Sequence, residues 1–240
     1  SITSVQNLIK CIRSIGIDIE DLVLEPLASS EAVLTEDEKE VGVILADIGG
    51  GTTDIAVFKD GSIWHTAILP VAGYQLTRDV AIGLGLPFEV AEEMKRKYSN
   101  VMPVYETKME TPSTMAEDGH GVSYQDLCDI IRARVEEILR LILLEMPRTE
   151  YETLVPAGLV LTGGSSNLPG LETLGREILR LPVRVGVPTN IGGITDVLRD
   201  PAYATGVGLL LWAAKREGRQ SWKSHGFLHR FISKIRNLFR

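Results

Sequence analysis

The sequence has 240 residues, of which 44% are hydrophobic and 24% are charged. This length allows one large domain or two small ones, and this composition excludes a disordered chain, a collagen-like chain and a disulfide scaffold. The two cysteines, Cys11 and Cys128, are far apart and lack metal-ligand spacing, which is typical of a protein from a reducing compartment. No signal-peptide pattern follows Ser1, and no run approaches the roughly 20 apolar residues that span a bilayer.

The net charge of −7 is unevenly distributed along the chain. Residues 215–240 contain eight basic residues and one acidic residue, a net charge of +7, so residues 1–214 carry −14. An acidic body argues against nucleic-acid binding. The basic end indicates an anionic target for that segment alone.

The first 40 residues combine one clear helical pattern with weaker signals. Apolar residues at helical spacing predict a helix over 4–15 that ends at Gly16. We further expect a short buried strand at Leu22–Leu24, a helix over 28–34, and a solvated turn in the acidic run Glu36–Glu40.

Three consecutive strands joined by tight turns are predicted next. A continuous apolar run over 41–46 is typical of a buried central strand. Strand composition resumes over 53–58 after three glycines, and the hairpin turn Lys59-Asp60-Gly61 leads into a third strand over 62–70.

The rest of the chain predicts helices alternating with strands. Residues 99–122 are polar and irregular, with short strands expected near 101–108, and Ser123 begins a capping pattern for a long helix to about Met146. The remaining predicted elements are helices over 73–84, 87–98, 171–179 and 202–215 and strands over 158–162 and 183–187.

The strongest functional signal is the run DIGGGTTD at residues 47–54, between two predicted strands. Three glycines let backbone N–H groups approach a phosphate without Cβ clashes. Hydroxyls could add donors, and Asp47 at a strand end is placed to bind a hydrated Mg²⁺. The alternative is a glycine-rich hairpin with an Asp at its rim, but the flanking acid and hydroxyls favour the phosphate site. Its candidate phosphate-binding residues are Gly49, Gly50, Gly51, Thr52 and Thr53.

A second glycine turn follows the predicted strand over 158–162. It contains Gly163, Gly164 and Ser165 and leads into a loop and a helix. Such a turn suits a nucleoside lying over the backbone. Alone it is a weak signal, and together with the first turn it is considerably stronger.

The two turns together resemble the second phosphate loop and the adenosine loop of the actin, sugar-kinase and heat-shock-chaperone superfamily. In this resemblance, Glu25 in the run EPLA corresponds to the residue near the attacking water, and residues 204–208 correspond to the second connecting motif. Glu92 and Lys95 resemble the pair that contacts adenine and ribose. Their alternative interpretation is an ordinary exposed i,i+3 pair.

Within this superfamily the sequence resembles the FtsA family of bacterial cell-division proteins. Residues 4–43, residues 54–73 and the C-terminal tail carry the resemblance. It implies an α/β, actin-like (ribonuclease H-like) ATPase domain, mainly the second half of that fold, with a mixed sheet, flanking helices and a C-terminal amphipathic helix. It also implies ATP and Mg²⁺ as cofactors, Glu25 and Asp47 as catalytic residues, and hydrolysis that is slow at best.

The family has an earlier phosphate loop, in the first half of its fold, that this sequence lacks. We therefore expect a truncated protein or fragment whose nucleotide binding is weak, because phosphates are held from one side only. The expected domains are the end of a first-domain region over 1–24, a second-domain core over 25–82 and 158–214, an inserted helical subdomain over 83–157, a linker over 215–225 and an amphipathic helix over 226–240.

The last fifteen residues predict a helix that lies on a membrane surface. At 100° per residue, seven apolar side chains fall within an arc of about 140°, and the basic side chains lie opposite. A helix packed on the body is the alternative, which the preceding polar linker and the charge disfavour. The residues expected to contact lipid are Phe227, Leu228, Arg230, Phe231, Ile232, Lys234, Ile235, Arg236, Leu238 and Phe239.

These features together predict a membrane-tethered, ATP-binding scaffold. The FtsA resemblance implies a location on the cytoplasmic face of the cell membrane at the division site, anionic lipids and the tubulin-like division protein FtsZ as partners, possible self-association, and docking of FtsZ on residues 83–157. The alternatives are a small-molecule kinase of the same superfamily, a chaperone or pilus-assembly relative, and a fragment that keeps partner and membrane binding without nucleotide.

Overall fold

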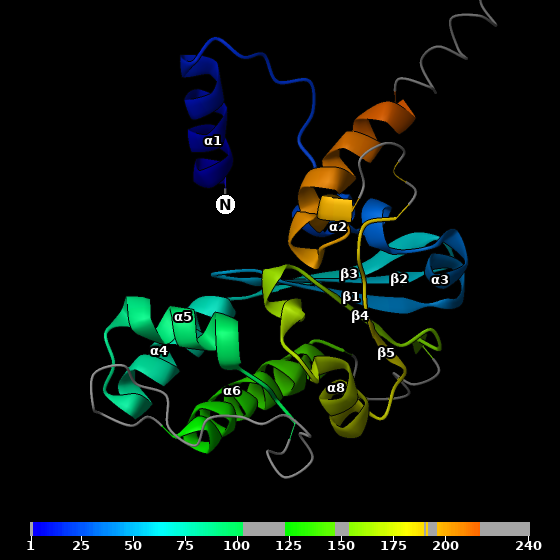
Figure 1. The fold of residues 1–240 in the computed structure, drawn as a ribbon. Coiled ribbons are helices and arrows are strands. Elements are labelled where there is room, and N and C mark those ends of the chain that lie inside the picture. The colour runs from blue at the N-terminus through cyan, green and yellow to red at the C-terminus, as the bar shows by residue number, and fades with distance from the viewer. Residues whose placement is uncertain (1, 103–122, 147–153, 190, 192–195, 217–240) are drawn as a thin grey trace, which may run out of the picture.

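The computed structural model of the protein describes residues 2–102, 123–146, 154–189, 191 and 196–216 (Figure 1). The strands predicted near 101–108 lie almost wholly outside these residues. The predicted amphipathic helix over 226–240, and the linker beyond residue 216, lie outside them as well. No helix in the described ranges is long and apolar enough to cross a membrane.

A five-stranded mixed sheet forms the centre of the molecule, with the strand order β3-β2-β1-β4-β5. The strands are β1 (Val43–Ile48), β2 (Thr53–Lys59), β3 (Ser62–Leu69), β4 (Leu159–Thr162) and β5 (Val183–Val185). Strands β1, β2 and β3 pair antiparallel, as two tight turns require, whereas β4 pairs parallel to β1 and to β5. The register sets Asp47 opposite both Asp54 and Thr162. The predicted strands over 41–46, 53–58, 62–70, 158–162 and 183–187 are confirmed, with β1 and β5 shifted or shortened by two residues.

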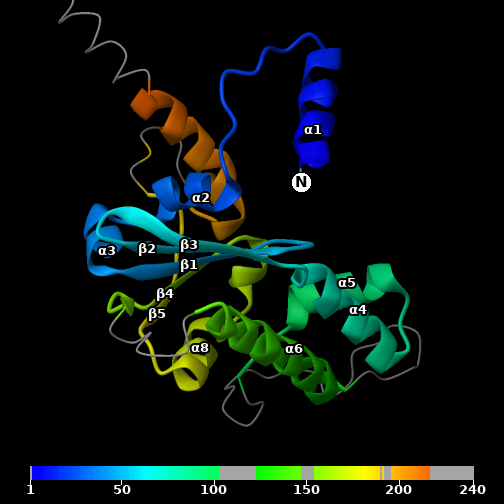
Figure 2. The ribbon, with the colours of Figure 1, turned by 180° about the vertical axis from the view of Figure 1, so that it is seen from behind.

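Helices cover both faces of the sheet (Figures 1 and 2). On one face lie α4 (Gly73–Leu84), α5 (Phe88–Tyr98), α6 (Tyr124–Leu144) and α8 (Leu171–Leu179). On the other lie α2 (Glu25–Val33) and a helix that the structure describes over 204–216. Because neighbouring strand residues point to opposite faces, Ile44 joins the first core and Leu45 the second.

Local sequence signals explain most of these helices. The Ser123 hydroxyl accepts a hydrogen bond from the Asp126 amide at 3.3 Å and so caps α6, as predicted. The predicted bounds of α4 and α8 are confirmed at both ends. Short 3₁₀ helices occupy Gly164–Asn167, Asp196–Leu198 and Pro201–Tyr203, and the last of these leads directly into the helix over 204–216.

Two predictions near the start of the chain are wrong. Leu22–Leu24 is an irregular exposed segment, because no strand in the described part of the chain pairs with it. Residues Glu36–Glu40 belong to α3 (Glu36–Val41), which begins with a capping box. Here the Glu38 amide donates to Thr35 Oγ1 at 3.1 Å, and the Thr35 amide donates to Glu38 Oε2 at 2.8 Å.

The first helix, α1 (Ile2–Ser14), stands apart from the sheet (Figure 1). It confirms the helix predicted over 4–15, and Gly16 follows it at a φ of 79°. On its apolar face Val5 and Leu8 are exposed, whereas Ile9 and Ile12 are half-buried.

Candidate nucleotide-binding site

The two glycine turns predicted from the sequence lie against each other. Each follows the carboxyl end of a strand, and these strands, β1 and β4, are parallel neighbours. The Ser165 hydroxyl of the second turn donates a hydrogen bond to the carbonyl of Gly49 in the first, at 2.9 Å. A Cβ atom on Gly163 would lie 2.4 Å from Asp47 Oδ1 and 2.6 Å from the Ile48 carbonyl oxygen. The second turn therefore needs glycine at 163 to approach the first.

A cavity of 880 Å³ opens in front of both turns. This volume lies in the range of small-molecule and cofactor sites. Its walls come from both turns and from α4 and α5. Seven of the residues predicted to bind a nucleotide line it: Gly49, Gly50, Gly51, Glu92, Lys95, Gly164 and Ser165.

The first turn presents bare backbone to the cavity. A Cβ atom on Gly50 or Gly51 would meet no atom within 4 Å, so open space lies beside this backbone. The turn is closed by a hydrogen bond of 3.0 Å from the Gly49 amide to the Thr52 carbonyl. A charged oxygen in the cavity can therefore approach the turn without meeting a side chain.

Asp47 lies directly behind the turns, at the end of β1, and is only 4% exposed. Its Oδ2 accepts hydrogen bonds from Ser29 Oγ at 2.6 Å and from Thr205 Oγ1 at 3.1 Å. Burial raises the pKa of the Asp47 carboxyl, the two hydroxyls oppose that shift, and the charge of Asp54 adds to it. The side chain is therefore held in position by two helices while its negative charge remains poorly compensated.

Glu25 and Asp54 add negative charge on the same side of the sheet. Burial raises the pKa of Glu25, the charges of Asp54 and Asp47 raise it further, and a hydrogen bond with Thr205 opposes them. No group of three or more His, Cys, Asp or Glu side chains in the described ranges is arranged to hold a metal ion. A Mg²⁺ at Asp47 would therefore take most of its ligands from phosphate and water, as Mg²⁺ commonly does.

Glu92 and Lys95 form a constrained pair on α5. Lys95 Nζ lies 2.7 Å from Glu92 Oε2, 2.8 Å from Thr77 Oγ1 and 3.1 Å from the Gly73 carbonyl, and Thr77 also donates to Glu92. Burial opposes ionisation of Glu92, but the bonds from Lys95 and Thr77 outweigh it and lower its pKa. Because the Lys95 side chain is only 12% exposed, this pair differs from an ordinary surface i,i+3 pair.

The remaining predicted residues do not line the cavity. Glu25, Asp47 and Gly163 are absent from its walls, and Thr52 donates to Asp54 Oδ2 at 2.9 Å. Thr53 is fully buried, and its hydroxyl donates to the Val71 carbonyl at 2.7 Å. The structure thus corrects the prediction that the Thr53 hydroxyl reaches a phosphate.

Several cavity residues escaped the sequence analysis. Phe88 and Arg96 lie one turn from Glu92 on α5, so projecting that helix would have found them. Phe88 also packs against Tyr74, with ring centroids 5.2 Å apart. No sequence signal joins Asn167 to Asp200, although their side chains meet at 2.8 Å beside the cavity.

The two helices that hold Asp47 pack with unusually little space between them. A Cβ atom on Gly208 would lie 1.8 Å from the carbonyl oxygen of Ala28, so the helix over 204–216 touches the backbone of α2. Near this contact Ser29 Oγ lies 3.0 Å from Thr205 Oγ1. The two predicted connecting motifs therefore meet behind the site.

Comparison with known proteins places the chain among cell-division proteins. The family model described as cell division protein FtsA matches residues 44–208. The chain is 46% identical over 220 residues to cell division protein FtsA of Pseudomonas aeruginosa. The aligned residues make up 90% of this chain and 53% of that protein. It is 39% identical over 228 residues to cell division protein FtsA of Bacillus subtilis. This alignment covers 94% of this chain and 50% of that protein. The chain thus spans about half the length of the curated relatives it matches.

A similar fold occurs in the crystal structure of MreB5 of Spiroplasma citri bound to ADP. The two structures superpose with a TM-score of 0.73, and their sequences are 15% identical. The match covers 92% of this chain and 68% of the MreB5 chain. This likeness and the mixed sheet with helices on both faces confirm the predicted actin-like α/β fold. Because the family model matches more than half of its residues, the chain belongs to the FtsA family of cell division proteins.

Proposed function

We propose that the chain binds a purine nucleoside triphosphate, ATP, together with Mg²⁺ in the 880 Å³ cavity. The observation that carries this proposal is the contact between the two glycine turns, with Ser165 bonded to Gly49 and Gly163 against Asp47. Open backbone at one turn suits phosphate, and a buried carboxylate directly behind it suits the accompanying cation.

Each predicted residue has a distinct role in this proposal. The backbone of Gly49–Gly51 holds the phosphates, and Asp47 holds the hydrated Mg²⁺, which supplies positive charge to the phosphates when bound. Glu92 and Lys95 contact the adenosine, whose base lies over Gly164. Glu25 orients water, and hydrolysis is slow at most.

A titration of the chain with a fluorescent ATP analogue and Mg²⁺ tests this proposal. We expect Asp47→Ala to weaken nucleotide binding by at least about tenfold, because it removes the cation's protein ligand. A tenfold loss corresponds to roughly 1.4 kcal/mol of binding free energy. Asp37→Ala is the matched control, because Asp37 is an exposed carboxylate on α3 that does not line the cavity. Equal binding, or equally negligible binding, by the native chain and Asp47→Ala contradicts the proposal.

We further propose that the chain tethers the tubulin-like division protein FtsZ to the cytoplasmic face of the membrane at the division site. Family membership supports the division role. The basic, amphipathic sequence of residues 226–240 supports an anionic lipid surface as its target. FtsZ would dock on the subdomain over 83–157, which includes all of α5 and α6.

Co-sedimentation with vesicles tests the tether. We expect FtsZ to sediment with anionic phosphatidylglycerol vesicles only when this chain is present. The double change Phe231→Ser and Ile235→Ser should abolish sedimentation of both proteins, because it removes apolar area from the tail. Sedimentation of FtsZ that survives this change would contradict the proposed tether.

A further inference from the structure

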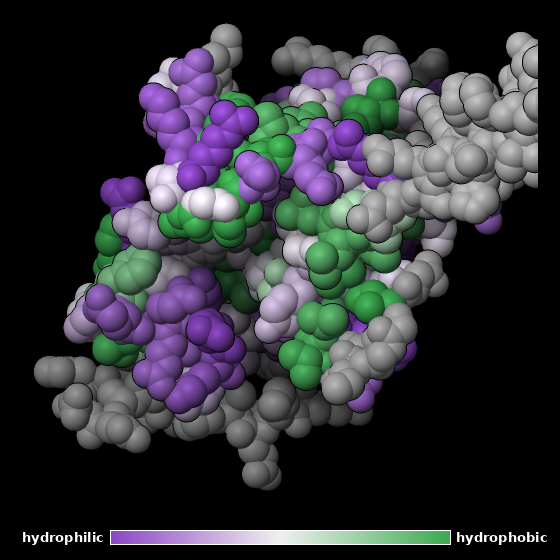
Figure 3. Space-filling view, turned by 90° about the horizontal axis from the view of Figure 1, so that it is seen from above, coloured by the Kyte–Doolittle hydropathy of each residue, from purple (hydrophilic) through white to green (hydrophobic). Residues whose placement is uncertain are grey.

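Thr77 of α4 is a completely buried polar side chain in the wall of the nucleotide cavity. Its hydroxyl accepts a hydrogen bond from Lys95 Nζ at 2.8 Å, donates to Glu92 Oε2 and lies 3.0 Å from the Gly73 carbonyl oxygen. A view from above shows the surface hollowed beside hydrophilic residues, on the side of the molecule that carries α5 (Figures 1 and 3). The Thr77 hydroxyl therefore joins α4 to both charged residues that α5 places at the cavity.

The ammonium group of Lys95 is fully engaged within the protein. It lies 2.7 Å from Glu92 Oε2, 2.8 Å from Thr77 Oγ1 and 3.1 Å from the Gly73 carbonyl oxygen. An ammonium has three N–H donors, and these three acceptors use all of them. Because the side chain is only 12% exposed, freeing a donor for a ligand would cost a buried hydrogen bond. The methylene chain of Lys95 can touch a nucleoside, whereas its charge acts on Glu92.

Glu92 keeps one carboxylate oxygen for a ligand. Lys95 and Thr77 both bond to Oε2, and Oε1 has no hydrogen-bond partner in the described part of the chain. Burial opposes ionisation, but the bonds from Lys95 and Thr77 outweigh it and lower the pKa of Glu92. The free oxygen of an ionised carboxylate only accepts hydrogen bonds, so its ligand must donate one. A nucleoside triphosphate offers such donors on the ribose and on the base amino group, and its phosphates offer none.

The first turn of α4 also fixes the phosphate turn, and this sets the position of Glu92 along a nucleotide. The Gly73 amide donates to the Gly49 carbonyl at 3.1 Å. Thr77 follows Gly73 by four residues, which is about 6 Å along the helix. Glu92 is therefore held roughly one helical turn from the backbone that is proposed to bind phosphate. The ribose is bonded directly to the phosphates and the base lies beyond it, so this position favours a ribose hydroxyl.

We infer that Thr77 is a positioning residue that makes the proposed site select ribonucleotides. Together with Lys95 it fixes the Glu92 carboxylate, so that Oε1 accepts a hydrogen bond from a ribose hydroxyl of the bound nucleotide. Thr77 acts through Glu92, because its own hydroxyl is already bonded within the protein. This inference rests on the proposed nucleotide binding, to which it adds a specificity for the sugar.

Displacement of the fluorescent ATP analogue by two nucleotides tests the selectivity. Thr77→Val removes the hydroxyl and keeps nearly the same shape, and we expect it to weaken Mg-ATP binding about tenfold. Binding of the dideoxy form of ATP, which lacks both ribose hydroxyls, should stay as weak as in the native chain. Thr77→Ser keeps the hydroxyl and should restore the affinity for Mg-ATP. Thr66→Val is the matched control, since Thr66 is exposed on β3 and does not line the cavity.

Two results of this comparison overturn the inference. One is an equal loss of affinity for ATP and for its dideoxy form in Thr77→Val, because the change would then act independently of the ribose. The other is unchanged binding of Mg-ATP by Thr77→Val. In both cases the native chain still binds Mg-ATP, so the proposed nucleotide site stands while the role of Thr77 fails.

An NMR titration of the Glu92 carboxyl tests the positioning without nucleotide. In the native chain the pKa of Glu92 lies below the ordinary value of 4.5. Thr77→Val should raise it, because a hydrogen bond that favours the ionised form is lost, and Thr66→Val should leave it unchanged. A Glu92 pKa that is the same in Thr77→Val as in the native chain overturns the positioning role. If the native chain does not bind Mg-ATP, the proposed function fails and the sugar specificity with it, whereas this titration still decides whether Thr77 fixes Glu92.

Discussion

The buried carboxylate of Asp47 is the residue on which the proposed nucleotide site most depends. Two hydroxyls hold it, but no basic side chain in the described ranges pairs with it. Its pKa is raised by burial, so the folded state binds its proton more tightly than the unfolded state does. Ionisation of Asp47 therefore lowers the free energy of unfolding, and this loss begins as the pH rises above the ordinary value of 3.8.

Asp47→Asn should make the metal-free chain more stable at pH 7. We expect a gain of about 1 kcal/mol, which corresponds to roughly 2–4 °C in Tm for a chain of this size. The stability gained by Asp47→Asn should be small below the ordinary pKa of Asp. It should grow as the pH rises through the raised pKa that Asp47 has in the folded state. Thermal melts at several pH values measure it, with and without Mg²⁺ and ATP analogue. A less stable variant at neutral pH, or stabilisation by Mg-nucleotide that survives the change, would contradict the role of Asp47.

Substitution by alanine should destabilise the fold at one glycine of the site and leave stability unchanged at another. Gly163→Ala places a Cβ 2.4 Å from Asp47 Oδ1, at a φ of 84° that alanine disfavours. We expect a loss of about 2–4 kcal/mol in the free energy of unfolding, as for other strained and overpacked sites. Gly50→Ala meets no atom within 4 Å, so it should leave unfolding in urea unchanged and weaken only nucleotide binding. Equal stability of the two variants would show that the turns do not pack as described.

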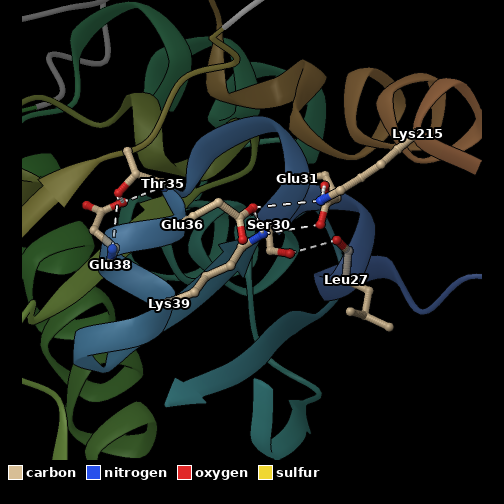
Figure 4. Close-up of polar contacts among 8 residues, drawn as sticks. All are labelled: Leu27, Ser30, Glu31, Thr35, Glu36, Glu38, Lys39 and Lys215. Carbon is tan, nitrogen blue, oxygen red and sulfur yellow. Dashed lines mark hydrogen bonds and ion pairs between the residues drawn. The ribbon is translucent and has the colours of Figure 1, made fainter. Parts of the chain in front are cut away.

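At the scale of elements, an ion-pair network joins α2, α3 and the last described helix (Figure 4). Lys39 of α3 is only 4% exposed and lies 3.2 Å from Glu31 of α2 and 3.4 Å from Glu36. Glu31 also lies 3.0 Å from Lys215. Burial opposes ionisation of Glu31, but hydrogen bonds and charges from the two lysines outweigh it and lower its pKa. The network thus ties the end of the last described helix to α2.

Glu31→Gln and Lys215→Gln should differ sharply in their effect on stability. Glu31→Gln leaves the buried Lys39 ammonium without its nearer partner, so we expect a cost of about 2–3 kcal/mol. Lys215 is 46% exposed, and its loss should cost less than about 1 kcal/mol. Urea denaturation at pH 7 measures both. The difference should shrink at acid pH, because the stability that Glu31 contributes is lost as the pH falls through its lowered folded pKa. A cost for Lys215→Gln that equals that of Glu31→Gln would contradict this account.

Elements with a strong local signal were predictable from the sequence, and elements that depend on distant partners were not. The helix over 73–84 ends at Gly85 in the left-handed conformation, and its bounds follow from that pattern. The wrong strand at Leu22–Leu24 has suitable composition, but strand formation needs a neighbour that the composition does not reveal. The missed helix α3 carried a local signal, the capping box of Thr35 and Glu38, that its acidic character obscured.

The candidate site also contains parts that have a local sequence signal and parts that depend on distant partners. The glycine turns were predictable because glycine marks close backbone approach, and the contact between Gly163 and Asp47 bears this out. The hydroxyls that hold Asp47 come from Ser29 and Thr205, which are 176 residues apart. Only the packing of α2 on the last described helix brings them together, and no spacing rule predicts it.

At the scale of the whole molecule, charge is segregated between an acidic body and a basic end. Residues 1–214 carry −14, and residues 215–240 carry +7. In the proposed membrane-bound state, an anionic leaflet would repel the body and attract the tail, so the charge distribution would orient the protein on the membrane. This attraction should weaken as salt is added, because exposed charges are screened over about 8 Å at physiological ionic strength.

Neutralising two basic residues of the tail tests this charge argument. Each basic residue near an anionic leaflet contributes about 1 kcal/mol, so Lys234→Gln with Arg236→Gln should weaken binding to phosphatidylglycerol vesicles by about 30-fold at low salt. The loss should be much smaller at high salt, and absent with zwitterionic vesicles. Lys59→Gln with Arg78→Gln removes the same charge from the body and should leave vesicle binding nearly unchanged. Equal losses for the two pairs would mean that net charge, and not the tail, determines binding to lipid.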